Sequence, residues 1–255
     1  MAAAKEKPRE WEADTYSRVA TPQAGWADET LDRVELRGDE RLLDAGCGTG
    51  NVTEKLVELL PDGHVIAVDG SADMVRVASE LLGDRAEVFE MDLNELELDE
   101  PVDVVFSNAV FHWVLDHENL FRRIHDSLVP GGRRLAQCGG HGNIAHVKEC
   151  IATVASRDPR LEEAFASMPA PWNYATPEET EARLREAGFS EVRAWIFDRP
   201  AQPEEPAEFL RTVIMAPYLE VIPADLHDDL IADVVTELGE PVVLDYVRLN
   251  MEATR

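Results

Sequence analysis

Three glycines on alternate positions, Gly46, Gly48 and Gly50, closely follow a short apolar run and Asp44. Glycine has no Cβ, so this stretch can turn tightly and leaves its main chain open to a ligand. Helical character after Gly50 predicts a strand, a tight turn and a helix start. The spacing matches neither the Gly-x-Gly-x-x-Gly of dinucleotide sites nor the Gly-Lys-Ser/Thr of phosphate loops. The stretch predicts a small ligand lying on the backbone, with a merely tight turn as the alternative.

Carboxylates stand at the ends of the next two predicted strands. Asp69 ends an apolar run, 25 positions after Asp44. A carboxylate at the tip of a second strand accepts hydrogen bonds from ribose hydroxyls, and the alternative is an acid that caps the helix beginning near Ser71. Met74 opens that helix, where its side chain would lie against an adenine ring or in the core. Asp92 stands at the third strand tip, so three acids at successive strand ends form one constellation.

A second stretch of reactive residue types begins at Asn108, where the fourth predicted strand ends. Within it, His112 has the chemistry to donate a hydrogen bond to a carboxylate or to act as a general base toward a hydroxyl. The alternative is a histidine that only caps a strand or is half buried. We expect Trp113 to shape a pocket rather than to react. His141 and His146, after the fifth strand, are further candidates, with surface histidines on a helix as the alternative.

Alternating strands and helices must position these residues. Apolar runs and turn signals predict strands over residues 41–45, 64–69, 87–91, 102–107, 134–138, 192–197 and 242–251. Helical patterns with caps or breakers lie between them, over residues 51–60, 71–83, 119–128, 144–156 and 176–187. This alternation is typical of βαβ units and of a doubly wound α/β fold.

Three further segments flank the alternating core. Aromatic and aliphatic residues at helical spacing precede the first strand, and Pro22 divides them into two helices. These residues pack on the core or, with Tyr16, form a lid over the ligand. We expect a single domain over residues 1–255, with N-terminal helices over 10–36, a ligand-binding core over 40–140, and substrate-side cap segments over 139–176 and 204–238.

The charge balance excludes one class of partner. The 255 residues include 51 acidic and 24 basic side chains, a formal net charge of -27. Such a field repels phosphate backbones, so we expect no nucleic acid partner. The acidic surface suits a protein that stays soluble in high salt, or it reflects biased codon usage. Both readings remain open.

Cysteine usage and hydropathy indicate the compartment. Cys47, Cys138 and Cys150 form no CxxC pair, so neither a metal site nor a disulfide framework is expected. The N-terminus lacks the apolar segment of a signal peptide, and no stretch approaches 18 apolar residues. We therefore expect a cytoplasmic protein with free thiols and no membrane contact.

The acid followed by x-Gly-x-Gly-x-Gly at residues 44–50 resembles, residue for residue, the first motif of class I S-adenosylmethionine (SAM)-dependent methyltransferases. Asp69, Asp92 and the stretch 108–113 follow in that family's order and at its spacing. The resemblance implies a Rossmann-like seven-stranded sheet, mostly parallel with an antiparallel last strand and with helices on both faces. It also implies SAM as the cofactor, S-adenosylhomocysteine (SAH) as the product, and no metal. The cofactor residues that it implies are Tyr16, Ala45, Gly46, Cys47, Gly48, Asp69, Met74, Asp92, Leu93 and Asn108.

Within that superfamily, the chain is similar to the trans-aconitate methyltransferase group, which includes carboxyl O-methyltransferases. The similarity rests on residues 11–16, 107–116 and 172–179. The chain departs from the glycine-proline-glycine version of the first motif in that group, and it has Phe111 and His112 before the tryptophan. The resemblance implies methyl transfer to a small-molecule acceptor by a monomer or homodimer, with His112 and Trp113 at the catalytic centre.

The nature of the acceptor determines whether a base is needed. A carboxylate, with a reference pKa near about 4, arrives ionised, whereas a phenol or amine near about 10 must lose a proton. O-methylation of a carboxylate is the favoured subclass. C-, N- or hydroxyl O-methylation with His112 as base, and a catalytically inactive SAM-binding accessory protein, are the alternatives. A nicotinamide-dependent oxidoreductase would share the sheet, but the glycine spacing argues against it.

Overall fold

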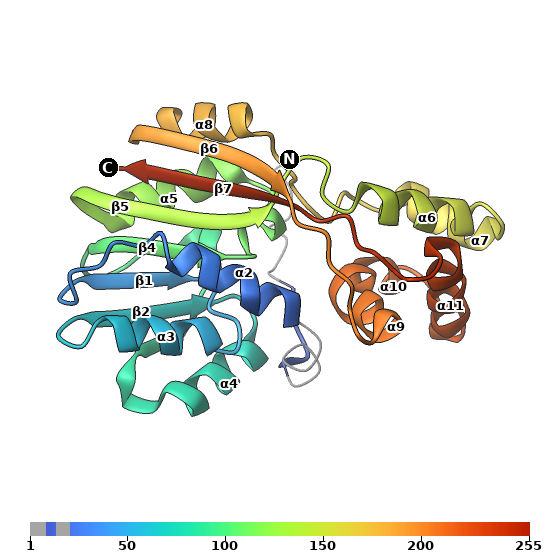
Figure 1. Ribbon diagram of the computed structural model, residues 1–255, viewed down its shortest axis with the longest axis horizontal. Helices are drawn as coiled ribbons and strands as arrows, with labels where there is room; N and C mark the ends of the chain where they lie inside the picture. The colour runs from blue at the N-terminus through green and yellow to red at the C-terminus, as the bar shows by residue number, and fades with distance from the viewer. Residues whose placement is uncertain (1–8, 14–20) are drawn as a thin grey trace.

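A computed structural model describes residues 9–13 and 21–255 (Figure 1). The described residues form one seven-stranded sheet of order β3-β2-β1-β4-β5-β7-β6. The strands are β1 (Arg41–Ala45), β2 (His64–Asp69), β3 (Glu87–Glu90), β4 (Val102–Asn108), β5 (Leu128–Gly139), β6 (Ser190–Asp198) and β7 (Val247–Thr254). Strands β1 to β5 pair in parallel, and β7 pairs antiparallel with both β5 and β6. The predicted mostly parallel sheet with an antiparallel last strand is confirmed.

Helices cover both faces of the sheet, as expected for central strands with nearly continuous apolar runs. On one face lie α2 (Thr21–Leu31), α3 (Asn51–Leu59) and α4 (Ala72–Leu82), and on the other lie α5 (His117–Ser127) and α8 (Pro177–Glu186). Neighbouring residues of β1 show the division, because Leu42 packs with Leu56 of α3 while Leu43 packs with Leu120 of α5. The central strands are therefore buried on both sides.

Sequence signals for helix starts are realised as side-chain caps. Thr176 and Glu179 form a reciprocal capping box at the start of α8, with Pro177 in its first turn. Asp116 accepts the Asn119 amide at 2.9 Å and starts α5. These local interactions explain why both helices begin within two residues of the predicted positions.

Five helices form a second cluster at one end of the sheet, here called the cap (Figure 1). They are α6 (Ala145–Ala155), α7 (Pro159–Ser167), α9 (Pro206–Phe209), α10 (Ala216–Leu219) and α11 (His227–Leu238). A π-helical turn (Leu210–Ile214) joins α9 to α10. The chain enters the cap after β5 and again after β6, and it returns through β7. The cap therefore has its own apolar core, built from both segments that sequence analysis placed outside the sheet.

Two predicted elements were wrong in extent. The last strand begins at Val247 rather than at residue 242, because Leu244 and Tyr246 are buried in the cap core and Asp245 accepts the His146 amide at 2.7 Å. The fifth strand begins at Leu128, six residues before its predicted start, and α7 was not predicted.

The N-terminal prediction is tested in part. Pro22 lies in the first turn of α2, which ends at Leu31 rather than at residue 36. Most of the first predicted helix, including Tyr16, lies outside the described residues. Within the part of the chain that the structure describes, no helix is long and apolar enough to cross a membrane.

Candidate active site

The glycine turn joins β1 to α3 at the carboxyl end of the sheet. The Gly46 and Cys47 amides both donate to the Val68 carbonyl oxygen, at 2.8 and 2.9 Å, which ties the turn to the end of β2. Gly46, Gly48 and Gly50 have φ angles of 89, 54 and 87°, a region that glycine adopts without a Cβ clash. The alternating glycines therefore turn the chain sharply between strand and helix, as predicted.

Gly46 and Gly48 have different surroundings. A Cβ built on Gly46 would lie 2.3 Å from Cγ2 of Val110, so close packing requires glycine there. A Cβ on Gly48 would meet no described atom within 4 Å. The main chain at Gly48 is therefore open to a ligand.

Asp69 ends β2 and its carboxylate faces the glycine turn. Its Oδ2 accepts the Gly48 amide at 2.9 Å, and its Oδ1 accepts the Ser71 amide at 3.0 Å. Burial raises the pKa of Asp69, and the two amides oppose that rise. Each carboxylate oxygen has two lone pairs, so Asp69 can fix the turn and still accept a hydrogen bond from a ligand.

Asp44, the acid of the first motif, is part of the scaffold. Its side chain is buried, and Oδ2 accepts the Thr53 hydroxyl of α3 at 2.7 Å. Burial raises the pKa of Asp44 to about 7, against the effect of Thr53. The hydrogen bond joins β1 to α3 across the turn.

The other predicted cofactor residues gather at the same edge of the sheet. Asp92 follows β3 and accepts the Asn94 amide at 2.8 Å, while Leu93 is buried in the sheet core. Met74 lies buried in the first turn of α4, and Asn108 ends β4. Strands β3, β2, β1 and β4 are neighbours, so their carboxyl ends bring these residues together with the glycine turn.

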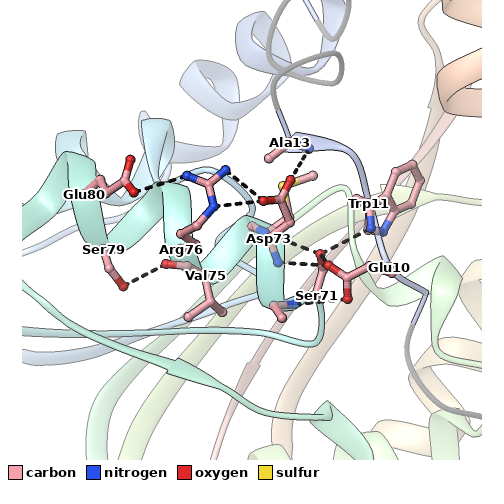
Figure 2. Close-up of polar contacts among 11 residues, drawn as sticks. Glu10, Trp11, Ala13, Ser71, Asp73, Val75, Arg76, Ser79 and Glu80 are labelled. Atoms are coloured by element: carbon pink, nitrogen blue, oxygen red, sulfur yellow. Dashed lines mark hydrogen bonds and ion pairs between the residues drawn. The ribbon is translucent and has the colours of Figure 1, made fainter.

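Residues 9–13, here called the N-terminal strap, lie against the start of α4 (Figure 2). The Glu10 carboxylate accepts the Ser71 hydroxyl at 2.7 Å and the Asp73 amide at 2.9 Å. The Trp11 amide donates to the Ser71 hydroxyl at 3.2 Å. An acid at a helix N-terminus is stabilised by the free amides there. The strap is therefore fixed within a few residues of Asp69.

A pocket lies where the loop after β4 meets the cap. The space between its walls, together with the solvent at its mouth, is about 400 Å³. Its walls are Trp11, Ala109, His112, Trp113, Asn143, Ile144, Trp172, Tyr174, Val213, Ile214, Tyr246 and Arg248. These residues come from the strap, the loop after β4, both cap segments and β7. The pocket thus unites parts of the chain that are far apart in sequence.

His112 is buried in the pocket wall, and its ring stacks on that of Tyr174 with 5.7 Å between centroids. The Gly139 amide donates to its Nδ1 at 3.4 Å, which assigns the ring proton to Nε2. Burial lowers the pKa of His112 well below its ordinary value, with contributions from Arg248 and His117. His112 is therefore a neutral hydrogen-bond donor and a weak base.

Arg248 brings a positive charge to the pocket from β7. Its side chain is 1% exposed, and its Nε donates to Oε1 of Gln137 at 3.1 Å. Gln137 in turn donates from Nε2 to Oδ1 of Asn250 at 3.2 Å, which fixes its amide orientation. The guanidinium lies 4.5 Å from the centroid of the Trp26 ring. Neighbouring strands and α2 therefore hold this arginine in place.

Aromatic rings form much of the remaining wall. Trp113 meets Trp11 edge to face, with ring centroids 5.0 Å apart. It also packs against Trp172, at 5.7 Å, and Trp172 stacks on Tyr174, at 5.5 Å. Such contacts favour one fixed arrangement of the rings. Trp113 therefore forms part of the pocket wall.

Sequence reasoning found part of this pocket. His112 and Trp113 lie in it together, whereas His141 and His146 are exposed and do not line it. Arg248 and the cap residues were missed. The one sequence signal for Arg248 was a basic residue inside an apolar strand pattern, and that pattern does not reveal which ligand an arginine faces.

The residues around the glycine turn fit the SAM that the sequence resemblance implies. The open main chain at Gly48 can accept close approach of a ligand. The half-buried carboxylates of Asp69 and Asp92 can accept hydrogen bonds from ribose and amino groups.

Comparisons with known proteins agree with this geometry. A family model described as a methyltransferase domain matches residues 42–132. The trans-aconitate 2-methyltransferase of Azoarcus sp. (strain BH72) is 31% identical over 227 residues, covering 87% of both chains. That of Methylobacterium nodulans is 31% identical over 188 residues, covering 73% of this chain and 67% of its own.

Solved structures show the same fold. The YcgJ protein of a Bacillus has a TM-score of 0.64 at 16% identity, covering 91% of this chain and 98% of its own. Phosphoethanolamine N-methyltransferase 2 of Haemonchus contortus, solved with SAM, has a TM-score of 0.60 at 20% identity, covering 91% of this chain and 52% of its own. With a relative at 31% identity along most of both sequences, the chain belongs to the class I SAM-dependent methyltransferases, in the group that contains the trans-aconitate 2-methyltransferases.

Proposed function

We propose that this methyltransferase transfers the methyl group of SAM to a carboxylate oxygen of a small acid. The observation that carries the proposal is Arg248, a buried arginine in the wall of the pocket. The chain has a net charge of -27, so an arginine held inside a pocket is a specific local attraction for an anion. Charge-assisted hydrogen bonds from a guanidinium to a carboxylate are among the strongest that a protein makes. The names of the trans-aconitate relatives also specify a carboxylic acid.

On this proposal, residues 40–140 hold the cofactor. Ala45, Gly46, Cys47 and Gly48 offer their main chain, Asp69 accepts from the ribose and Met74 lies against the adenine. Asp92 binds the adenine amino group, and the main chain of Leu93 contacts the adenine ring. Asn108 and Tyr16 are the remaining residues of the site. The position of Asp69 on the Gly48 amide supports this assignment. Bound SAM supplies a methyl group on a positively charged sulfur, already activated for transfer.

The cap segments, residues 139–176 and 204–238, cover the acceptor. Arg248 binds and orients the acid, His112 donates a hydrogen bond from Nε2, and Trp113 excludes water. Holding reactants in line is worth roughly 7–11 kcal/mol at best. A carboxylate with a reference pKa near about 4 is already ionised at neutral pH, so no base is required. The Nδ1 lone pair of His112 accepts the Gly139 amide, and burial lowers the pKa of the ring, so His112 is a poor proton acceptor. Both observations support this reading over base-assisted methylation of a hydroxyl.

The test is SAH formation with an acid, the matching alcohol and the matching amine. We expect turnover of the acid alone, with kcat independent of pH between 5.5 and 8 at saturating SAM. Arg248→Met should remove acid turnover while SAH still binds. Arg193→Met is the matched control, because Arg193 also stacks on a tryptophan, Trp195, but is exposed on β6.

Other outcomes separate the alternatives. Turnover of the alcohol or amine with a titration that His112→Gln abolishes would replace the proposal with base-assisted methylation. SAH binding without an acceptor would favour an inactive accessory protein. Light scattering on the same sample tests the expectation of a monomer or homodimer.

A further inference from the structure

We propose that the acceptor is an apolar monocarboxylic acid, with one carboxylate and an aliphatic or aromatic body, rather than a polycarboxylic acid. This inference rests on the proposed function and adds the class of acid. It separates this chain from relatives named for trans-aconitate, which carries three carboxylic groups. The composition of the pocket wall carries the argument.

Seven of the twelve described lining residues are aliphatic or tryptophan. The tryptophans at 11, 113 and 172 form one side, and aliphatic side chains of the cap form another. Ile144, Val213 and Ile214 are the aliphatic members, and all three are buried. Apolar walls favour an acceptor in proportion to the apolar area that it buries. A compact, heavily charged acid would leave this surface without an apolar partner.

Permanent positive charge is confined to one point of the described wall. Arg248 is the only lysine or arginine among the described lining residues. Lys148 has its Nζ 5.8 Å from the centroid of the Tyr174 ring, but its side chain is exposed and does not line the pocket. One guanidinium matches one carboxylate. A second or third carboxylate would be desolvated against aromatic and aliphatic groups without a cation.

The side chain of Asn143 already makes hydrogen bonds within the protein. Its Oδ1 accepts the Val247 amide at 2.9 Å, and its side chain also hydrogen-bonds the Tyr174 side chain. An additional carboxylate would have to compete with these interactions. Tyr174 and Tyr246 also line the pocket, but a phenol brings no positive charge. Charge recognition of the acid is therefore concentrated at Arg248.

The experiment compares straight-chain monoacids from butanoate to decanoate with α,ω-diacids of equal carbon number and with trans-aconitate. Turnover is followed as SAH formation by the full chain. We expect kcat/KM to rise by about three- to fourfold per methylene until the pocket is filled. A diacid should be roughly 30-fold poorer than its matched monoacid. Diacid or trans-aconitate turnover equal to or better than that of every monoacid would overturn the inference while leaving carboxylate methylation intact.

Two further measurements separate failure of this inference from failure of the proposed function. Matched alcohols and amines are included, and turnover of these without any acid would refute the proposed function itself. If no compound is methylated, calorimetric titration of each monoacid in the presence of SAH decides, and absence of binding overturns the inference.

A charge-insertion variant tests the wall directly. Val213→Lys places a second cation beside the pocket and should shift the monoacid-to-diacid preference toward the diacid by about tenfold or more. Val243→Lys is the matched control, because Val243 is 37% exposed and does not line the pocket. SAH affinity checks that each variant is folded. An unchanged preference in folded Val213→Lys would contradict the proposed orientation of the acid.

Discussion

The proposed cofactor site around the glycine turn, here called the cofactor cleft, and the proposed acceptor pocket are constructed differently. The cleft consists of main chain, glycines and carboxylates at neighbouring strand ends, and Asp69 accepts the Gly48 amide across it. The pocket consists of side chains from distant segments, mainly aromatic and aliphatic, around Arg248. Backbone geometry suits a cofactor that every family member shares, whereas side chains can be exchanged without disturbing the sheet. Changes in the cleft should therefore affect folding and cofactor binding, and changes in the pocket should affect acceptor choice.

The largest expected effect comes from Gly46. Gly46→Ala places a Cβ 2.3 Å from Val110 at φ 89°, which costs roughly 2–5 kcal/mol in overpacking and backbone strain. Gly48→Ala costs about 1–2 kcal/mol through its positive φ, but its Cβ would occupy the open space proposed for the cofactor. Urea unfolding and SAH titration measure the two effects. Equal loss of stability in both variants would contradict the distinction between a packed and an open glycine.

The buried acid of the cleft should make stability depend on pH. The pKa of Asp44 is raised from 3.8 to about 7 in the folded chain, so the folded state keeps a proton that the unfolded state releases over that range. The unfolding free energy should therefore fall as pH rises from about 4 to 7, by at most roughly 4 kcal/mol relative to Asp44→Asn. Urea unfolding of both proteins across this range measures the difference. Parallel stability profiles would show that Asp44 titrates normally.

Asp69 provides an intermediate effect confined to the cleft. Asp69→Ala removes the acceptor of the Gly48 and Ser71 amides and should weaken SAM binding by roughly 1.5–3 kcal/mol. Asp103→Ala also removes an acceptor of a backbone amide, that of Arg41 at 2.9 Å, but at the start of β1. Calorimetry should show a loss for the first variant alone. Unchanged affinity in Asp69→Ala would exclude the ribose role.

The smallest effect concerns the strap. Glu10→Gln keeps an oxygen acceptor but removes the charge at the start of α4, and should weaken SAH binding by about 0.3–1 kcal/mol, or two- to fivefold. Glu80→Gln is the control on the same helix, where Glu80 pairs with Arg76 at 3.2 Å. An equal change in both variants would assign the effect to overall charge.

The difference between the cofactor cleft and the acceptor pocket also explains which parts of the molecule could be predicted from the sequence. The strand ends, the glycine turn and Asp69 depend on residues close together in sequence, and parallel pairing then aligns the strand tips. Arg248 depends on β7 being inserted between β5 and β6 and on the cap folding over it. The early part of the predicted last strand was wrong for the same reason, because burial of Leu244 in the cap core outweighed strand propensity. Long-range packing of this kind leaves no short motif.

The two contacts of Trp11 bear on the order in which the cofactor and the acceptor bind. Its amide is held by Ser71 beside the cofactor cleft, while its ring packs on Trp113 in the wall of the acceptor pocket. The wall of the pocket is therefore complete only when the strap is docked on the start of α4. If SAM bound near Asp69 stabilises this docking, the cofactor should enter first and SAH should leave last, giving a compulsory-order kinetic mechanism. An unreactive acid analogue should then inhibit uncompetitively against SAM.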